Sequence, residues 1–530
     1  MKEEGRASNL HTKTIKNINK KIQEFQRYFE RIWNGVKPLG KLFHTNSRGY
    51  LYDTGTNKLI GCDEMIFLLL KKLLSMNIAQ AISEFVLENG CEQFLYAANA
   101  VKNAIEKENV LLALKAELFD LSEHSLNYKD LIDSSLEILF LEVTERCNLG
   151  CGYCVYNEPV KYKRNHGSKD MPPVIAHSAI DYLEKHSYKR EKVAISIYGG
   201  EPLLQYPLIK SCVKYAGSII KKREIDFSIT TNATLVTPEI AEYFYKNNFN
   251  VFASIDGPSD SHNLYRKYPK GNGSYKDSIR GLKNLISAYG ESSKGKISLS
   301  MVYAPPFSGK RIDRIAELWD EEPWLPKDIG IHITYPSSGT IPLTKISKSE
   351  IEEDQNLRQW AFDKFKNKYI GKGDSHPIAD SIMNRNFAQL MQRSLFHESF
   401  DRYTMNGCCL PGVKRLYVSV DGNFHVCERI ATDAPTIGNI YSGIDLDVVK
   451  KVYIDGYEEI SLPLCSTCWA VRLCSSCYTD VFKNGKLDME TKSNHCVYLK
   501  DSQEQLLEHF CTLLELKPDG LNYLYDFGLT

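Results

Sequence analysis

The chain has 530 residues, more than one hydrophobic core usually organises, so we expect one large domain with smaller modules at its ends. Its 66 Lys and Arg residues balance its 66 Asp and Glu residues, which argues against a nucleic-acid or membrane-surface partner. The first residues lack the apolar core of a secretory signal and no apolar run reaches spanning length, so we expect a cytoplasmic protein.

The N-terminal quarter is predicted to contain a helix and a small mixed module. In residues 1–35 apolar residues recur every three or four positions from Ile15 to Ile32, with basic residues between them, which predicts an amphipathic helix with a solvated charged face. Residues 36–125 contain two strand-like runs joined at 53–57 and three helical patterns near 63–75, 77–89 and 91–107. This order fits a winged-helix-like module.

Alternating strands and helices fill residues 136–336. The predicted strands are 138–143, 193–198, 227–231, 251–255, 297–303 and 329–334, with helices near 173–187, 206–222, 238–248 and 275–288. Six such units predict an α/β fold, a partial (β/α)6 TIM barrel whose functional residues follow the carboxyl ends of the strands. Residues 337–405 read as a helical connector, 406–500 as a cysteine-rich module and 501–530 as a C-terminal helix.

Clustered cysteines are the strongest chemical signal, because in a reducing compartment they more often bind metal than form disulfides. Cys147, Cys151 and Cys154 follow the first predicted barrel strand with the spacing CxxxCxxC. Three thiolates can hold three irons of a cubane cluster and leave the fourth iron open. The alternative is a zinc site, which would need a fourth ligand. The lone cysteines Cys62, Cys91, Cys212 and Cys511 read as buried small hydrophobes.

With Tyr153 before the third cysteine, this motif resembles the radical S-adenosylmethionine superfamily. The resemblance implies a [4Fe–4S] cluster whose open iron binds S-adenosyl-L-methionine, and a 5'-deoxyadenosyl radical that abstracts a substrate hydrogen. Later segments resemble the family's GGEP, TNG-type and SLDGP-type motifs, with Ala233 in place of a glycine. They imply these cofactor-binding residues besides Tyr153: Gly199, Gly200, Glu201, Pro202, Asn232, Ser254, Asp256 and Arg266. The plainer alternatives are a turn for GGEP, a strand-end cap for Ser254 and a surface charge for Arg266.

The second cysteine group resembles the SPASM domain, which carries two auxiliary four-iron clusters. By that resemblance Cys409, Cys427 and Cys477 hold the first auxiliary cluster, and Cys465, Cys468, Cys474 and Cys496 hold the second. The final CxxC gap departs from the family spacing, and the first cluster lacks one ligand unless Cys408 joins or a substrate thiolate binds there. A zinc ribbon is the alternative for 465–477.

The three parts together resemble the sactipeptide and ranthipeptide maturases of ribosomally made peptides, in which an RRE-like (PqqD-like) module at 36–125 binds the leader of the precursor peptide. Residues 36–125 could instead serve docking or dimerisation. The implied function is thioether formation between a Cys sulfur and a carbon of a Cys-rich precursor, with flavodoxin or ferredoxin as electron donor. Formylglycine formation, C–C or C–O crosslinking, a zinc-binding scaffold and an iron–sulfur electron carrier remain alternatives. No acid or base is assigned, although Asp256 and Glu428 are candidates.

Overall fold

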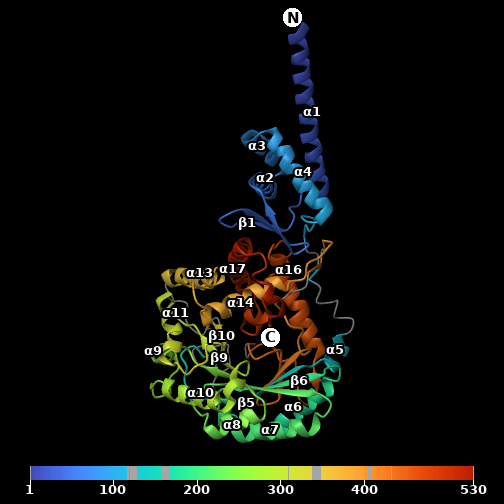
Figure 1. The fold of residues 1–530 in the computed structure, drawn as a ribbon. Helices are drawn as coiled ribbons and strands as arrows, with labels where there is room; N and C mark the ends of the chain where they lie inside the picture. The colour runs from blue at the N-terminus through green and yellow to red at the C-terminus, as the bar shows by residue number, and fades with distance from the viewer. Residues whose placement is uncertain are drawn as a thin grey trace.

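The molecule has an N-terminal lobe above a larger body, and the N-terminal end of helix α1 projects beyond this lobe (Figure 1). The computed structural model describes residues 2–115, 118–119, 128–154, 156, 167–307, 309–336, 348–399, 402–403, 407–430 and 433–528. The first part of the predicted connector, 337–347, lies outside these ranges. Among the described residues, no helix combines the length and apolarity needed to cross a bilayer.

The N-terminal lobe is built from one antiparallel sheet and four helices. Its elements are α1 Lys2–Trp33, β1 Gly40–His44, β2 Gly49–Asp53, β3 Lys58–Cys62, α2 Glu64–Ser75, α3 Ile78–Asn89 and α4 Cys91–Glu108. The prediction of two strands was wrong, because the first run turns back at residues 45–48 and forms both β1 and β2. Asp63 and Asn77 cap α2 and α3 through their side-chain oxygens, which explains why these helices begin where they do.

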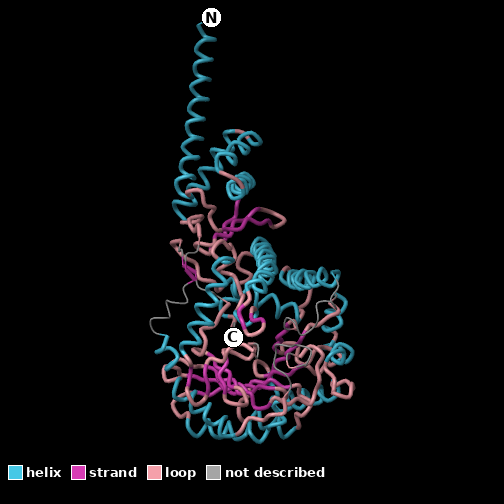
Figure 2. The backbone as a smooth tube through the Cα atoms, turned by 180° about the vertical axis from the view of Figure 1, so that it is seen from behind, coloured by secondary structure: helices cyan, strands magenta, loops and turns pink. Residues whose placement is uncertain are grey.

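Six parallel strands, close to the predicted positions, form one part of the large sheet and begin at its β10 edge. They are β5 Ile138–Thr144, β6 Lys192–Gly199, β7 Glu224–Thr231, β8 Asn250–Ser254, β9 Ile297–Val302 and β10 Gly330–Thr334, paired in that order. Between them run α6 Pro173–His186, η2 Pro202–Gln205, α7 Tyr206–Ile219, α8 Pro238–Lys246, α9 Ser259–Tyr265, α10 Tyr275–Tyr289, η3 Gly290–Ser293, α11 Gly309–Ala316 and α12 Leu318–Glu321. Helices α6, α7, α8 and α10 lie on one side of the sheet, and C-terminal elements lie on the other (Figures 1 and 2).

The C-terminal third continues this sheet. Strand β12 Arg415–Val418 pairs in parallel with β5, and β13 Asn423–His425, β14 Gly438–Asn439 and β15 Gly443–Ile444 follow at its edge. One hydrophobic core therefore joins residues of β5, such as Leu139, to residues of β12 and β13, such as Leu416 and Phe424. The cysteine-rich region is fixed to the strand that precedes the first cysteine motif.

Helices and short elements complete the body. They are β4 Leu118–Phe119, α5 Tyr128–Ser134, α13 Lys348–Tyr369, α14 Pro377–Met391, β11 Arg402–Tyr403, α15 Leu446–Val448, η5 Val449–Gly456, α16 Tyr457–Cys465, η6 Tyr478–Asp480, β16 Phe482–Lys483, β17 Lys486–Leu487, α17 Met489–Leu516 and η7 Asn522–Asp526. The terminal helix was predicted to begin near 500, but α17 begins at Met489 after the Asp488 cap, so Cys496 lies on it.

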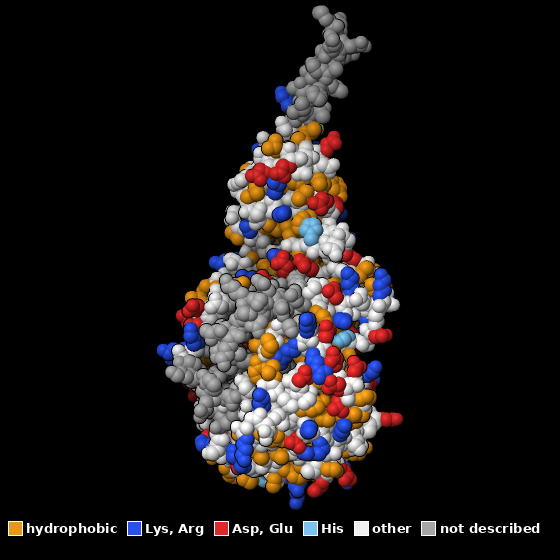
Figure 3. Space-filling model, turned by 90° about the vertical axis from the view of Figure 1, so that its left-hand side faces the viewer, with side chains coloured by type: hydrophobic (Ala, Val, Ile, Leu, Met, Phe, Trp, Pro, Cys, Tyr) orange, Lys and Arg blue, Asp and Glu red, His pale blue; other side chains and the backbone are white. Residues whose placement is uncertain are grey.

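The four lone cysteines differ in how far they are buried. Cys62, Cys212 and Cys511 are buried as expected, whereas Cys91 is only half-buried because it is the first residue of α4, after Gly90. On the face of the molecule seen in Figure 3, acidic and basic side chains are interspersed, in keeping with the balanced charge of the chain.

Candidate metal and cofactor sites

The first cysteine motif lies in a loop directly after β5, which we call the thiol loop (residues 145–154). Cys151 is buried, Cys147 and Cys154 are half-buried, and all three belong to one apolar cluster with Tyr153. Backbone bonds hold this loop against the segment after α9: the N–H groups of Gly150 and Gly152 donate to the carbonyls of Lys267 and Tyr265, at 2.8 and 3.1 Å. The three thiols are therefore gathered by a loop with an ordered backbone.

Burial disfavours deprotonation of these three thiols. It raises the pKa of Cys147 to about 12 and that of Cys151 to about 11, although the nearby Arg266 guanidinium opposes the rise at Cys151. Burial also raises the pKa of Cys154. Thiolate is the form that binds metal, and a bound metal removes such protons. The donor set fits a cationic iron centre that would deprotonate all three.

Asp256 connects the thiol loop to the sheet. One carboxylate oxygen accepts hydrogen bonds from Tyr153 Oη and from Arg266 Nε, the latter at 2.9 Å, and the other accepts from the Val302 N–H at 2.9 Å. The Arg266 guanidinium lies 5.5 Å from the centroid of the Tyr153 ring. Asp256 and Arg266 are 2% and 7% exposed, so Arg266 is a buried cation rather than the surface charge considered above. Asp256 is occupied in holding Tyr153 and Arg266.

Glu201 organises the ends of β6 and β7. Its buried carboxylate accepts from Leu203 N at 3.0 Å, Thr231 Oγ1 at 2.8 Å and Asn232 N at 2.8 Å. Burial raises the pKa of Glu201 in spite of these bonds. Just before it, Gly199 has a φ of +133°, and a Cβ there would lie 2.3 Å from the Thr144 carbonyl oxygen, so the turn requires glycine.

Asn232 ties the end of β7 to the thiol loop. Its Nδ2 donates to Asn148 Oδ1 at 2.8 Å, and Asn148 donates in turn to Thr234 Oγ1 at 2.9 Å. The intervening Ala233 has a φ of +62°, which accounts for the glycine that related motifs carry at this position. Ser254 ends β8, and Pro202 begins η2; both are buried. The predicted cofactor residues thus lie at the carboxyl ends of neighbouring strands, around the thiol loop.

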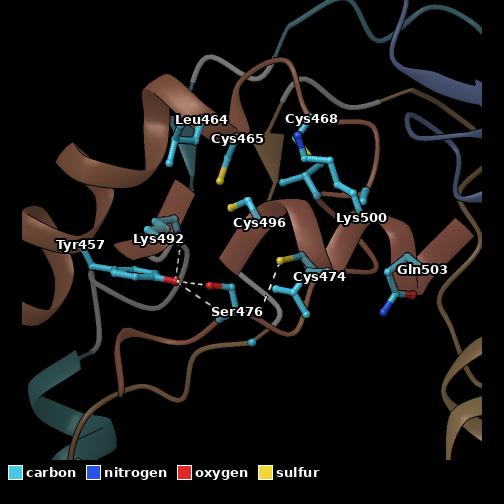
Figure 4. A pocket seen from close by; sticks show the side chains of 14 residues that line it. Tyr457, Leu464, Cys465, Cys468, Cys474, Ser476, Lys492, Cys496, Lys500 and Gln503 are labelled. Carbon is cyan, nitrogen blue, oxygen red and sulfur yellow. Dashed lines mark hydrogen bonds between the residues drawn. The ribbon is translucent and has the colours of Figure 1, made fainter. Parts of the chain in front are cut away.

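Four C-terminal thiols line one cavity, which we call the four-thiol cavity (Figure 4). Cys465 ends α16, Cys468 and Cys474 lie in the following loop, and Cys496 lies on α17. The cavity is also lined by Lys492 and Lys500 from α17 and by Tyr457 and Ser476. This is the set that the resemblance to the SPASM domain implied for the second auxiliary cluster.

The remaining four cysteines gather near Tyr478, whose hydroxyl donates to the Cys409 carbonyl at 2.8 Å. Cys408, Cys427 and Cys477 pack against the main core, and the Cys408 thiol is hydrogen-bonded to Cys477, which lowers the pKa of Cys477. Cys409 is exposed. Cys408, which spacing left unassigned, is therefore better buried beside Cys477 than Cys409 is.

The described cysteines of these sites do not converge on one point. Among the described residues, no group of three or more His, Cys, Asp or Glu side chains converges tightly enough to hold a metal ion. Tetrahedral zinc draws four ligands to about 2.0–2.3 Å from one atom. Four thiols spread around a cavity instead suit a group with several metal atoms, each bound by one sulfur.

Comparison with known proteins gives a family for the centre of the chain. Residues 141–318 match the Radical SAM superfamily. The chain is 30% identical over 211 residues to the radical SAM cyclopropyl synthase TigE of Paramaledivibacter caminithermalis, covering 36% of this chain and 43% of that protein. It is 34% identical over 158 residues to the serine-type anaerobic sulfatase-maturating enzyme of Bacteroides thetaiotaomicron, covering 29% of this chain and 37% of that enzyme. The chain thus spans less than half the length of these curated relatives.

A solved structure shares the fold over a larger part of the chain. Native anSMEcpe with bound AdoMet superposes with a TM-score of 0.53 at 19% identity, covering 74% of this chain and all of that one. At this identity the likeness concerns the fold alone.

Proposed function

We propose that this chain, whose residues 141–318 form a domain of the Radical SAM superfamily, is a cytoplasmic peptide maturase that forms thioether crosslinks in a Cys-rich ribosomal precursor peptide. The observation that carries the proposal is the combination of the thiol loop with two further sets of four cysteines in the C-terminal third. Thioether formation needs a radical source that removes a hydrogen atom from the peptide. It also needs an acceptor for the electron that is left over when the carbon–sulfur bond forms.

In this proposal the thiol loop holds a [4Fe–4S] cluster through Cys147, Cys151 and Cys154. When bound, the cluster and S-adenosyl-L-methionine supply a 5'-deoxyadenosyl radical that removes a hydrogen atom from the substrate. Asp256 fixes Tyr153 and Arg266 behind the loop, and Glu201 fixes the ends of β6 and β7, where Gly199, Gly200 and Pro202 line the approach to the cofactor. Asn232 and Ser254 complete the set of cofactor contacts.

The C-terminal thiols would hold two auxiliary clusters. Cys465, Cys468, Cys474 and Cys496 form one ligand set, which the four-thiol cavity supports. Cys409, Cys427 and Cys477 form the other, and the burial of Cys408 beside Cys477 favours Cys408 as its fourth ligand. A filled ligand set would leave no open iron there for a substrate thiolate.

The net reaction loses two hydrogens per bond. For the step to balance, the acceptor carbon would lose one hydrogen atom, the cysteine would lose its thiol proton to a base, and one electron would be left over, for which a cluster held by the C-terminal thiols would be the acceptor. Glu428 is a candidate base, because its side chain is mostly buried and its Oε2 makes no hydrogen bond among the described residues. Asp256 is a poor candidate, since both its oxygens are already occupied.

Peptide binding is proposed for the N-terminal lobe. The sheet β1–β2–β3 has two edge strands, and β3 pairs only with β2 among the described residues. An extended leader peptide could add to such an edge through backbone hydrogen bonds. Flavodoxin or ferredoxin is the proposed electron donor.

Formylglycine formation is the main rival, favoured by the similarity to the sulfatase-maturating enzyme of Bacteroides thetaiotaomicron, and C–C or C–O crosslinking is another. The deciding experiment incubates reconstituted protein anaerobically with S-adenosyl-L-methionine, a reductant and a candidate Cys-rich precursor. Thioether formation predicts a loss of two hydrogens per bond and of one alkylatable thiol. Loss of two hydrogens with all thiols still alkylatable would refute thioether chemistry, and a new aldehyde would indicate formylglycine.

A further inference from the structure

Lys492 is a buried lysine on the wall of the four-thiol cavity. Its side chain is 2% exposed, its Nζ donates to Tyr457 Oη at 2.7 Å, and Nζ lies 4.2 Å from the centroid of that ring (Figure 4). Among the described residues no carboxylate lies within ion-pair distance of it. The hydroxyl and the ring of Tyr457 are therefore the partners of this ammonium group among the described residues.

Tyr457 alone offers a buried cation little compensation for its lost hydration. Removing an ammonium from water costs several kcal/mol, and a cation–π contact returns about 2 kcal/mol when desolvated. A buried charge is normally paired with an opposite charge or bound to a metal site. The thiols of Cys465, Cys468 and Cys474 line the same cavity from other elements, and the Cys496 thiol lines it from the same helix as Lys492. Four thiolates on iron would supply the missing negative charge.

Helix α17 presents a second lysine to the same cavity. Lys492, Cys496 and Lys500 are four residues apart, so they lie on one face of the helix. Lys500 is more exposed than Lys492, and solvent screens its charge more strongly. The ligand Cys496 therefore stands between one buried and one screened cation.

We propose that Lys492 is a positioning residue that supplies the counter-charge of the cluster bound by Cys465, Cys468, Cys474 and Cys496, and that it makes this cluster easier to reduce. The inference rests on the proposed function, because it requires a cluster at the four-thiol cavity. Reduction adds one negative charge to the cluster, and a fixed positive charge in a low-dielectric wall favours the more negative state. In the proposed reaction this would help the cluster accept the electron that the substrate gives up.

The test is an anaerobic redox titration followed by electron paramagnetic resonance. The full chain with Cys147, Cys151 and Cys154 changed to Ala serves as background, so that only C-terminal clusters contribute. Lys492→Met removes the charge at similar volume, and Lys492→Arg keeps it. Lys486→Met removes a charge from exposed β17 in the same region and is the control. Iron and acid-labile sulfide are measured in each variant.

We expect Lys492→Met to lower the ratio of reduced to oxidised cluster about tenfold at a fixed potential, which corresponds to about 59 mV for one electron. Lys492→Arg should stay near the background protein, and Lys486→Met should not change. Loss of the cluster in Lys492→Met but not in Lys492→Arg would also support the proposal.

The role of Lys492 would be refuted by an unchanged ratio of reduced to oxidised cluster in an iron-loaded Lys492→Met protein. It would also be refuted by equal shifts or equal cluster loss in the Met and Arg variants, because packing rather than charge would then be responsible. If the background protein itself holds no iron and sulfide, the proposed function fails at the C-terminal region, and that result is distinct from a failure of the role of Lys492.

Discussion

Changing Asp256 to Asn should destabilise the protein and loosen the thiol loop. The substitution preserves size but removes the charge that faces Arg266 Nε at 2.9 Å, in a site where both residues are almost fully buried. Breaking a buried ion pair by removing one partner costs about 3–5 kcal/mol, mostly because the other charge stays buried and unpaired. The bonds from Tyr153 and Val302 are weakened by the same change but should not be added to this figure, since the groups share one carboxylate.

The assay is urea unfolding of the metal-free chain at pH 7.5 for Asp256→Asn, Arg266→Met and the double variant. If the pair is coupled, the double variant should lose less free energy of unfolding than the two single losses combined. Asp328→Asn is the control, because its partner Lys294 lies at a similar distance of 2.9 Å but both are exposed, and we expect no measurable change. A loss below about 1 kcal/mol in Asp256→Asn, or strict additivity, would refute the assigned role.

Three further predictions concern the thiol loop, the glycine turn and pH. Cys151→Ala should lower the bound iron of the reconstituted protein by roughly one third and abolish cleavage of S-adenosyl-L-methionine, and an unchanged iron content would contradict a cluster on this loop. Gly199→Ala should lower the free energy of unfolding by about 1–3 kcal/mol, because its Cβ would meet the Thr144 carbonyl and its φ is positive. Gly217→Ala in α7 is the control: open space surrounds this glycine, so the same unfolding assay should show no loss of stability or a gain. Burial lowers the pKa of His262 from 6.5 to about 3, so the unfolded chain binds more protons than the folded chain between these two pH values. The free energy of unfolding should therefore be highest above pH 6.5 and about 2 kcal/mol lower at pH 5. His262→Gln should lose less stability than the parent chain between pH 7.5 and pH 5 if this protonation is the cause.

Local patterns predicted much of the fold. The six strands follow from short apolar runs separated by helical periods. The error at β1 and β2 was a missed turn: Asn46, Ser47 and Gly49 are residues that favour turns, but they lie within the stretch predicted as one strand-like run. The pairing of β12 with β5 joins segments nearly three hundred residues apart, and no local pattern encodes it.

Sequence motifs supplied the candidate site residues but not the hydrogen bonds among them. The resemblance to the SPASM domain placed Cys409 in the first auxiliary set and left Cys408 as a possible fourth ligand. Which of these neighbouring side chains is the better buried depends on the tertiary structure. Arg266 was predicted as a cofactor contact, with a surface charge as the alternative, and Lys492 was not singled out. The burial of both depends on contacts, with Asp256 and Tyr457 respectively, that form only in the folded chain. The four-residue spacing of Lys492 and Cys496 on a helix is the signal that could have identified the lysine.

The pairing of β12 with β5 bears on how such a chain can be shortened or recombined. A fragment ending at residue 336 would leave the hydrogen-bonding groups of Ile138 to Leu141 without their β12 partners, and an uncovered strand of this kind invites association between molecules. The cysteine-rich part is thus structurally dependent on the preceding domain. A chimera that exchanges it between relatives would need a β5 strand that pairs with the new β12.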